Sequence, residues 1–526
     1  MDSPPSNGKT SNKACHNCRR RRLRCDRSYP HCNKCLSAGK ECLGYGKLFR
    51  WIGAVASRGK LAGRTSCAPD DAPRNPKPSN PRSAKPCLAS PDRDHGQLVC
   101  RPSTVDIGPV GTPWTLVDPV FQDIEPSHRR YLSYFTQRLC SELMPLDSFN
   151  VNPFFNLLPL SRVHPLLQHT LVAVSASHMS NLIKPRLLPA ADPNSLATLP
   201  GVEESSRHAY QHALAAKHKA LSLMRDAVQH IDFASADVVL SAVVFLINLE
   251  LIDSGKHGWK AHLKGAGRIL SLLPPALPGN EDLRDLMFSD SLVYFVMGSA
   301  FIPAPAFEVG PFFQPSHFPD MLKKAAAYSY NSCPAVILEI IYEASQLSNR
   351  TGDQVAEDDM AAAGLNLMQR ARAFDVEEWA RNEDNFRSMR APVLQTRFHA
   401  GSAFRLAVCL YILRSIPTLS AMKCHDDMVD ALARDIIYHT SSVPDDDPNL
   451  KVITWPIFVV GADTSDPARR EWVRQKMHLL AASCPWGFLY TAMETLEKLW
   501  NMNLAAKGQK CWVKFLKDNE MNFLVV

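Results

Sequence analysis

The chain has 526 residues and a formal net charge of +7, and 45% of its residues are hydrophobic and 8% aromatic. It is too long for one ordinary domain, and its composition is that of a folded protein, which excludes a fibrous or wholly disordered chain. Charge is spread unevenly: residues 1–64 contain fifteen Lys and Arg against three Asp and Glu, so they sum to +12 and the rest to −5. A basic first segment on a mildly acidic body is typical of a nucleic-acid-binding head.

The N-terminus and the apolar runs of the sequence argue against a secreted protein and a membrane protein. The first ten residues are polar and lack the apolar core of a signal peptide. The longest apolar run, Val238–Ile252, has fifteen residues, whereas a helix needs roughly 20 to span a bilayer. Nine cysteines are scattered beyond residue 64, as expected for reduced, mostly buried thiols. We therefore expect an intracellular protein without a membrane segment.

Residues 1–12 are polar and predicted to be disordered, and after them six cysteines follow a repeated spacing. Their pattern is C-x2-C-x6-C, given twice and joined by six residues. Zinc prefers a tetrahedron of thiolates, and three sulfurs in each half leave each tetrahedron one ligand short. Two zinc ions that share two bridging sulfurs solve this most simply. The predicted metal ligands are Cys15, Cys18, Cys25, Cys32, Cys35 and Cys42.

Two other interpretations of the cysteines are weaker. A secreted disulfide scaffold would need a signal peptide, which the N-terminus does not resemble. A mononuclear site with four thiolates would leave two thiols without a role. A nearly coreless unit of this size, at residues 13–43, also needs a metal to fold. A four-sulfur zinc site is structural, since it leaves no open position for a reacting water.

The head resembles the fungal Zn2Cys6 binuclear-cluster transcription factors. The resemblance rests on the two equal half-spacings, the basic run after the second cysteine, Asp26 directly after the third cysteine, and Pro30 between the halves. It implies that Cys15 and Cys32 bridge the two zinc ions. It also implies that Cys18 and Cys25 complete one zinc site, and that Cys35 and Cys42 complete the other.

The same resemblance assigns the basic residues to double-stranded DNA. A short helix is expected after Cys18, and it would offer one or two side chains to the major groove while others meet phosphates. The family positions that read a CGG triplet are Arg21 and Arg22, and the arginine fork suits guanine. A nuclear-localisation patch or a solvated face is the alternative for an isolated arginine run. The predicted DNA contacts are Arg19, Arg20, Arg21, Arg22, Arg24, Lys34 and Lys40.

Two segments without a core are predicted next. Residues 44–64 mix aromatic and basic side chains, either to cover the cluster or to extend the DNA contact, and we favour the covering role. The amino-acid sequence of this segment resembles the subgroup of the family that includes the acriflavine-sensitivity control protein. Residues 65–119 contain eleven of the 39 prolines and are predicted to be a linker. No heptad pattern follows the cluster, so a homodimer held by a coiled coil is not supported.

Residues 120–526 are predicted to be an all-α regulatory domain. Apolar residues recur at helical spacing, and neither period-2 alternation nor a glycine-rich βαβ signal is present. One helix should have Pro165 in its first turn and carry Leu167, Leu171, Val174 and His178 on one face. Another should bury a face of Tyr210, Leu214, Leu221, Met224, Val228 and Ile231. Further helices are expected at 236–252, 334–346, 361–382, 394–415, 427–440, 470–483 and 488–501.

No catalytic signature emerges, because serine-hydrolase, zinc-protease, Walker and dinucleotide motifs are all missing from the sequence. The predicted function is that of a nuclear, zinc-dependent regulator of RNA polymerase II transcription, whose body gates activity or recruits the transcription machinery or co-regulators. The subgroup resemblance implies control of a secondary-metabolite gene cluster. Two alternatives are an interaction or ligand-sensing body with a non-specific DNA anchor, and an enzyme with a zinc-stabilised appendage.

Overall fold

The structure is a computed structural model of the chain, and the described residues form two compact units, one within residues 1–108 (the head) and one within 109–526 (the body). The predicted unstructured start at 1–12, most of the extension at 44–64 and the linker at 65–119 lie outside the described residues. The described residues are 13–28, 31–40, 42, 45, 124–143, 152–183, 200–229, 235–256, 258–272, 281–303, 321–323, 325, 333–350, 357–386, 393–420, 425–447, 449–502, 511–519 and 522–526.

The head contains two short helices of equal length. Helices α1 (His16–Arg20) and α2 (Asn33–Ser37) have five residues each. Each begins at a cysteine whose sulfur accepts the N–H of the residue three positions on, so Cys15 and Cys32 are the N-caps. Helices this short are not stable alone in water. Their conformation therefore depends on the cysteines that start them.

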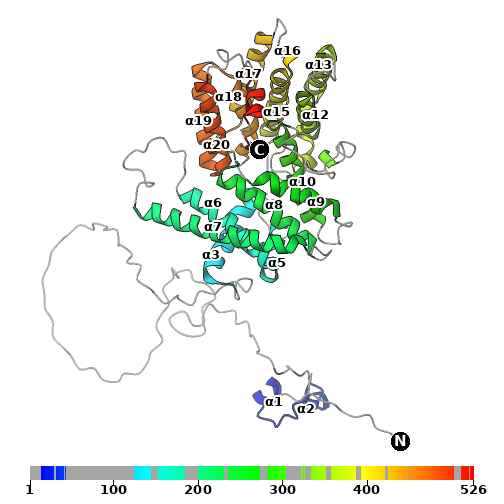
Figure 1. Cartoon of the computed structure of the whole chain (residues 1–526). Helices are drawn as coiled ribbons and strands as arrows, with labels where there is room; N and C mark the ends of the chain where they lie inside the picture. The colour runs from blue at the N-terminus through cyan, green and yellow to red at the C-terminus, as the bar shows by residue number, and fades with distance from the viewer. Residues whose placement is uncertain are drawn as a thin grey trace, which may run out of the picture. The chain divides into compact units, whose positions relative to one another are not determined.

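The body is built from helices that form two groups in Figure 1, with the C-terminus between them. The first group comprises α3 (Pro126–Tyr134), the π-helix η2 (Phe135–Leu139), α4 (Cys140–Leu143), η3 (Pro153–Asn156), α5 (Leu157–Val163), α6 (Pro165–Ile183), α7 (Pro200–Gln229), α8 (Ala236–Asp253), α9 (Trp259–Leu272) and α10 (Glu281–Ser299). The second comprises α12 (Ala335–Asn349), α13 (Glu357–Ala373), α14 (Val376–Arg381), η7 (Glu383–Phe386), α15 (Leu394–Ser415), α16 (Pro417–Ser420), α17 (His425–Ser441), η8 (Leu450–Ile453), α18 (Thr454–Asp463), α19 (Pro467–Ser483), α20 (Gly487–Asn501) and α21 (Trp512–Asp518). The described part of the body contains no strand, and the prediction of an all-α fold is confirmed.

Helix α8 is the centre of the first group. Every residue from Ala236 to Ile252 is buried, because α6, α9, α10 and α20 all pack against this helix. The apolar run that the sequence contains is therefore a core helix. None of the described helices combines the length and apolarity that crossing a membrane requires.

Helix α7 corrects the predicted amphipathic face. Leu214, Leu221 and Val228 are 49%, 39% and 51% exposed, so the prediction that they are buried was wrong. The face that packs on α6 is built instead from small residues, namely Ala209, Ala213, Ala216 and Ala220, together with Met224. Alanine is the best helix former and lets two helices approach closely. Ile231 lies outside the described residues.

A second correction concerns the helix predicted at 361–382. The structure divides this segment into α13 and α14, with a break at Asp375. The Asp375 carboxylate accepts the N–H of Glu378 at 2.9 Å and so starts a new helix. Apolar spacing continues across the break, which is why periodicity alone did not reveal it. Helix α10 was not predicted from the sequence.

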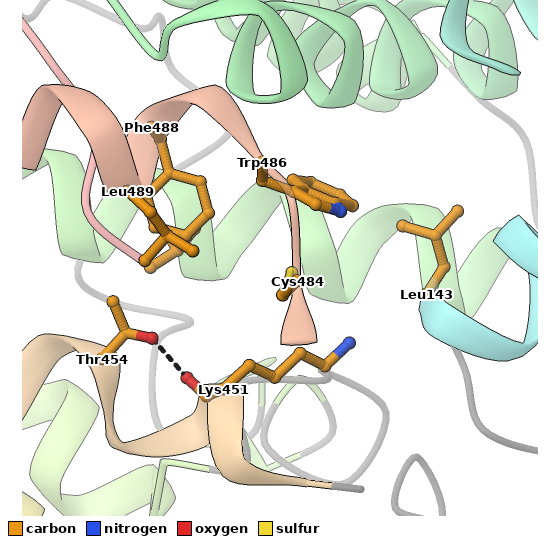
Figure 2. A pocket seen from close by; sticks show the side chains of 8 residues that line it. Leu143, Lys451, Thr454, Cys484, Trp486, Phe488 and Leu489 are labelled. Carbon is orange, nitrogen blue, oxygen red and sulfur yellow. Dashed lines mark hydrogen bonds between the residues drawn. The ribbon is translucent and has the colours of Figure 1, made fainter. Parts of the chain in front are cut away.

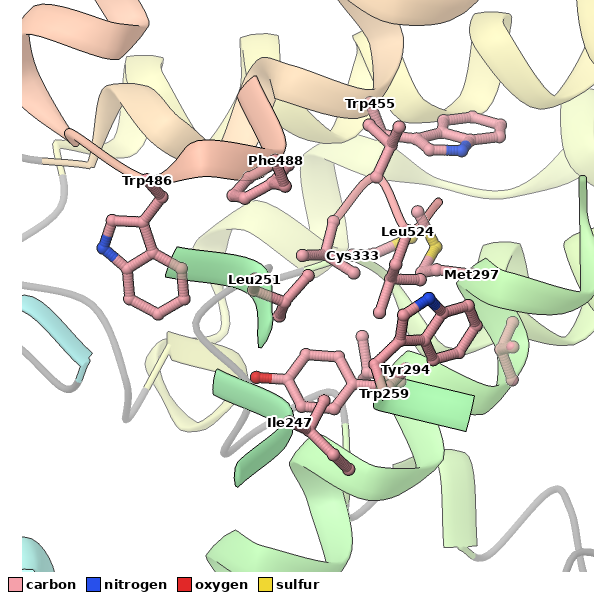
Figure 3. Packing of buried hydrophobic residues seen from close by; sticks show 14 of the residues in the cluster. Ile247, Leu251, Trp259, Tyr294, Met297, Cys333, Trp455, Trp486, Phe488 and Leu524 are labelled. Carbon is pink, nitrogen blue, oxygen red and sulfur yellow. The ribbon is translucent and has the colours of Figure 1, made fainter. Parts of the chain in front are cut away.

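The segment 522–526 joins the two groups of helices. The Leu524 N–H donates to the Gly255 carbonyl at 3.1 Å, and the Phe523 ring contacts those of Phe301 and Phe458. Figure 3 shows Leu524 among side chains of both groups, with Trp259 on one side and Trp455 on the other. Both tryptophans are fully buried, as expected for core anchors. The body thus has one continuous core.

Candidate metal centre and nucleic-acid interface

Four cysteine sulfurs of the head lie within one small volume. Cys15 Sγ is 3.5 Å from Cys32 Sγ and 3.7 Å from Cys35 Sγ, and Cys18 Sγ is 3.8 Å and 3.9 Å from the same two sulfurs. A tetrahedron of sulfurs bound to zinc at about 2.3 Å has edges of about 3.8 Å. These four sulfurs are as close together as the ligands of a zinc ion, whereas Cys25 Sγ lies within 4.8 Å of Cys32 Sγ and outside the group of four.

The two halves of the head have matching geometry. Cys15 N–H points to Cys25 Sγ at 3.4 Å, and Cys32 N–H points to Cys42 Sγ at the same distance. Within each helix, the N–H of the second cysteine lies 3.3 Å from the sulfur of the first. The repeated spacing in the sequence has become a repeated structure. Backbone N–H groups directed at sulfur favour the thiolate that a metal requires.

The environment of the sulfurs opposes ionisation unless a cation is bound. Burial raises the pKa of Cys15 to about 12 and also raises the pKa values of Cys18 and Cys32. At Cys25, burial acts in the same direction, but N–H groups of Cys15 and Arg27 outweigh it and lower the pKa. A coordinated metal ion supplies the positive charge that keeps such thiols deprotonated. The donor set fits a thiophilic divalent cation.

Asp26 ties the first half of the head to the second. Its carboxylate accepts the backbone N–H of Asn33 at 2.9 Å and of Lys34 at 3.1 Å, at the start of α2. The Ser28 hydroxyl donates to the same carboxylate, and Ser28 carbonyl accepts the Tyr45 hydroxyl at 2.5 Å. These hydrogen bonds lower the pKa of Asp26, with that from Ser28 contributing most. Tyr45 packs against the cysteines, as predicted for a covering extension.

The predicted DNA contacts form an exposed basic surface around both helices. Arg21, Lys34 and Lys40 line a groove of about 210 Å³ beside Cys18 and Cys35. This groove brings together basic residues from the two halves, which the sequence alone did not show. The exposed side chains are those of Arg19, Arg21, Arg22, Arg24, Lys34 and Lys40, and the side chain of Arg20 lies outside the description.

Arg21 and Arg22 differ in backbone conformation. Arg21 is the C-cap of α1, whereas Arg22 lies beyond the helix end with a φ of 54°. The Leu23 N–H donates to the Cys18 carbonyl at 2.9 Å and closes this turn. A left-handed conformation is uncommon for a residue with a side chain, and such positions often occur at functional sites. The two side chains predicted to read bases therefore leave the backbone at different points of the turn.

In the body, Glu142 is the centre of a buried polar network. Its Oε1 lies 2.9 Å from His178 Nε2 and accepts the Trp486 indole N–H at 3.1 Å, while Oε2 accepts from Arg138 at 3.2 Å. Lys451 donates to the Glu142 carbonyl. Burial would raise the pKa of Glu142, but His178, Lys451 and Arg138 outweigh it and hold the pKa at about 2.

This network lies beside a narrow apolar recess. Lys451, Cys484 and Trp486 line it together with Leu143, as Figure 2 shows. Its volume of about 10 Å³ has room for roughly one water molecule, so it is not a ligand site in this conformation. The residues come from segments more than 300 positions apart in the chain, and sequence reasoning did not connect them. His178 was predicted on one helix face with Leu167, Leu171 and Val174; it is buried there, and its contact with Glu142 was not predicted.

Comparison with known proteins identifies both units. Residues 13–51 match the fungal Zn(2)-Cys(6) binuclear cluster domain, and residues 130–526 match the fungal specific transcription factor domain. The chain belongs to the fungal Zn2Cys6 transcription factors. The acriflavine sensitivity control protein acr-2 of Neurospora crassa is 30% identical to it, over 98% of this chain and 97% of that protein. No solved structure matches the chain.

Membership of this family gives the head and the body their general roles. The Zn2Cys6 domain binds zinc and DNA, and the cysteine geometry described above agrees with that chemistry. The helical body corresponds to the regulatory domain of these transcription factors. The chain is thus a zinc-dependent DNA-binding regulator of transcription.

Proposed function

We propose that the head holds two zinc ions through six thiolates and reads a CGG-like triplet in double-stranded DNA to regulate RNA polymerase II transcription in the nucleus. The observation that supports this most is that cysteine sulfurs from the two halves of the head lie next to one another. Cys15 lies against Cys35, and Cys32 lies against Cys18, each within 3.8 Å. A sulfur that neighbours both halves can serve two metal ions at once.

The ligand assignment is the one that the family resemblance implies. Cys15 and Cys32 bridge the ions, Cys18 and Cys25 complete one site, and Cys35 and Cys42 complete the other. When bound, the ions supply rigidity and charge and take no part in a reaction, because every coordination position is filled by protein sulfur. Metal analysis of the purified protein tests the count. Two zinc ions per chain are expected, and one per chain would contradict the shared-ligand arrangement.

Base reading is assigned to Arg21 and Arg22. Arg22 leaves the left-handed turn beyond α1, and an arginine fork can donate to O6 and N7 of guanine together. Phosphate contacts are assigned to Arg19, Arg20, Arg24, Lys34 and Lys40. The groove lined by Lys34 and Lys40 supports this division, since two cations from different turns suit a backbone phosphate.

Selection from a random DNA pool with the full-length protein tests the assignment. We expect a GC-rich triplet to be enriched. Arg22→Ala should cost about 1–3 kcal/mol and relax the sequence preference, whereas Lys34→Ala should weaken binding evenly and reduce the salt slope by about 1. An unenriched pool would favour the alternative function, in which the body is the interaction or ligand-sensing module and the head is a non-specific anchor.

For the body, we propose gating of activity or recruitment of co-regulators or the transcription machinery. Its target genes would be a secondary-metabolite cluster, or genes that control sensitivity to acriflavine, as the name of the similar Neurospora protein suggests. A map of genomic sites occupied by the protein distinguishes these two sets. The spacing of triplets within those sites also tests the homodimer, because a dimer selects paired half-sites at a fixed distance.

A further inference from the structure

Four histidines from three helices meet at the first helix of the body. His128 lies on α3, His169 on α6, and His208 and His212 lie one turn apart on α7. The rings of His128 and His169 meet edge to face with centroids 5.1 Å apart, and those of His208 and His212 lie 4.3 Å apart. We call these four side chains the imidazole cluster. Neither the metal centre nor the DNA contacts include them.

The cluster lies where α3 packs on its neighbours. His128 Nδ1 is 3.3 Å from Gln168 Oε1 of α6, and the His212 ring of α7 packs against the Tyr131 ring of α3 at 5.6 Å. His169 Nδ1 is buried and has no hydrogen-bond partner among the described residues. A proton added to that nitrogen would find no acceptor in this arrangement. The contacts therefore suit neutral rings.

Charged groups around the cluster add to this preference. Glu125 and Arg130 approach from α3 or its N-cap, and Lys219 approaches from α7. The Arg130 guanidinium also lies 6.0 Å from the centre of the Tyr131 ring. Of these charged groups, the Glu125 carboxylate is negative, and Arg130 and Lys219 are positive. Each proton taken up by the cluster therefore adds like charge to a site that is already positive.

The pKa values of the two partly buried rings, His169 and His212, are changed in the same direction. Burial lowers the pKa of His169, and the neighbouring His128 and Lys219 lower it further. Burial also lowers the pKa of His212, assisted by His208 and Arg130. A histidine whose pKa is lower in the packed state stabilises that state above pH ~6.5, its ordinary value. This stabilisation is lost as the pH falls below 6.5 and through the lowered values.

We propose that the imidazole cluster is a proton-sensitive latch, which holds α3 against α6 and α7 while its rings are neutral and releases α3 when they take up protons. Helix α3 is the first described helix of the body, so it is the body element closest in sequence to the head. Mild acidification therefore acts on the end of the body that leads toward the DNA-binding unit. The inference does not depend on the proposed DNA sequence or on the zinc count.

Hydrogen exchange of the full-length, zinc-loaded protein at pH 7.5 and pH 5.5 tests the latch, after correction for the intrinsic pH dependence of exchange. Opening of α3 peptides should rise at the lower pH, because the packed state loses the stabilisation that its neutral rings provide above pH ~6.5. Peptides of α8, which is buried on all sides, should not change. The double variant His169→Gln, His212→Gln should lose the rise in α3.

A second histidine pair provides the matched control. His399 on α15 and His439 on α17 have Nδ1 atoms 2.9 Å apart, and burial lowers both pKa values. The change His439→Gln should leave the α3 response intact. Equal α3 exchange at the two pH values, or an undiminished response in the double variant, would overturn the latch. If the double variant does not fold, the single variants His169→Gln and His212→Gln replace it, and responses in both equal to that of the natural chain have the same meaning.

Discussion

The buried cluster of the head consists of cysteines, whereas the body has a core that extends from Ile124 to Val526. Among the described residues of the head, five cysteine side chains are buried, and Cys25 and Tyr45 pack against them. In the body, aromatic and aliphatic side chains from both groups of helices interlock around α8. Apolar burial stabilises the body in proportion to its area, and the head has almost no such area. The difference teaches that one chain can contain a unit whose fold depends on a cation and another whose fold does not.

Removal of metal should reveal the largest difference between the two units, in whether each stays folded. With a chelator present, the head is expected to unfold and lose DNA binding, because zinc contributes on the order of 10–16 kcal/mol to folding of comparable small domains. The body should keep its helical circular dichroism signal and its unfolding midpoint. Cys15→Ser should have the effect of the chelator, and Cys409→Ser, a buried thiol of the body, should leave DNA binding intact. DNA binding that survives chelation would contradict the comparison.

The largest effect inside the body is expected at Glu142. Glu142→Ala leaves the Trp486 indole and the His178 ring without their shared acceptor, and breaking a buried charged pair costs about 3–5 kcal/mol. Glu142→Gln keeps an oxygen acceptor and should cost less. Denaturant unfolding followed by tryptophan fluorescence measures both, and DNA selection by the two variants should be unchanged.

The Glu142 carboxylate also makes the free energy of unfolding of the body depend on pH in the acid range. Its pKa is about 2 in the folded protein and ~4.3 in an unfolded chain, so it contributes about 3 kcal/mol above pH ~4.3. This stability is lost as the pH falls from 4.3 toward 2. Unfolding free energies measured at pH 6 and pH 3 should differ less in Glu142→Gln than in the natural chain. An equal difference in the two proteins would assign the acid sensitivity to other groups.

Helix α7 offers a smaller test of which side chains form the core. Ala220→Leu should destabilise the body by about 1–3 kcal/mol, because this position is fully buried against α6 and a larger side chain overpacks it. Leu214→Ser, on the exposed face, should change the unfolding free energy by no more than about 0.5 kcal/mol. A larger loss of stability in Leu214→Ser than in Ala220→Leu would show that the face of α7 predicted from periodicity is the buried one.

The smallest effect is expected in the head at Asp26. Asp26→Ala removes the acceptor for two backbone N–H groups at the start of α2, so the orientation of Lys34 should become less fixed. DNA affinity should fall by less than in any cysteine variant, while the zinc content stays unchanged. Asp26→Asn, which retains one acceptor oxygen, serves as the matched control. Loss of zinc in Asp26→Ala would show that the link between halves is required for metal binding.

Much of this comparison was accessible from the sequence, and the failures have physical causes. The cysteine spacing predicted that the cysteines of the two halves lie close together, and four of the six sulfurs do, because metal geometry restricts the spacing of donors within short segments. Apolar patterning predicted α8 and α15 to within a residue of their ends, since both helices are apolar and buried along most of their length. It misjudged α7, where alanine forms the contact surface, and it did not detect the break at Asp375. The Glu142 network joins residues hundreds of positions apart, and no local pattern encodes such contacts.

The mixing of sulfurs between the halves of the head bears on how the protein responds to the supply of metal. If the head holds two ions as proposed, the first ion to bind should order the ligands for the second, because Cys15 and Cys32 each neighbour sulfurs of the other half. Loading should then be cooperative, with few chains carrying a single ion. Such a head would pass from inactive to active over a narrow range of free zinc, and that range would set the threshold for its genes.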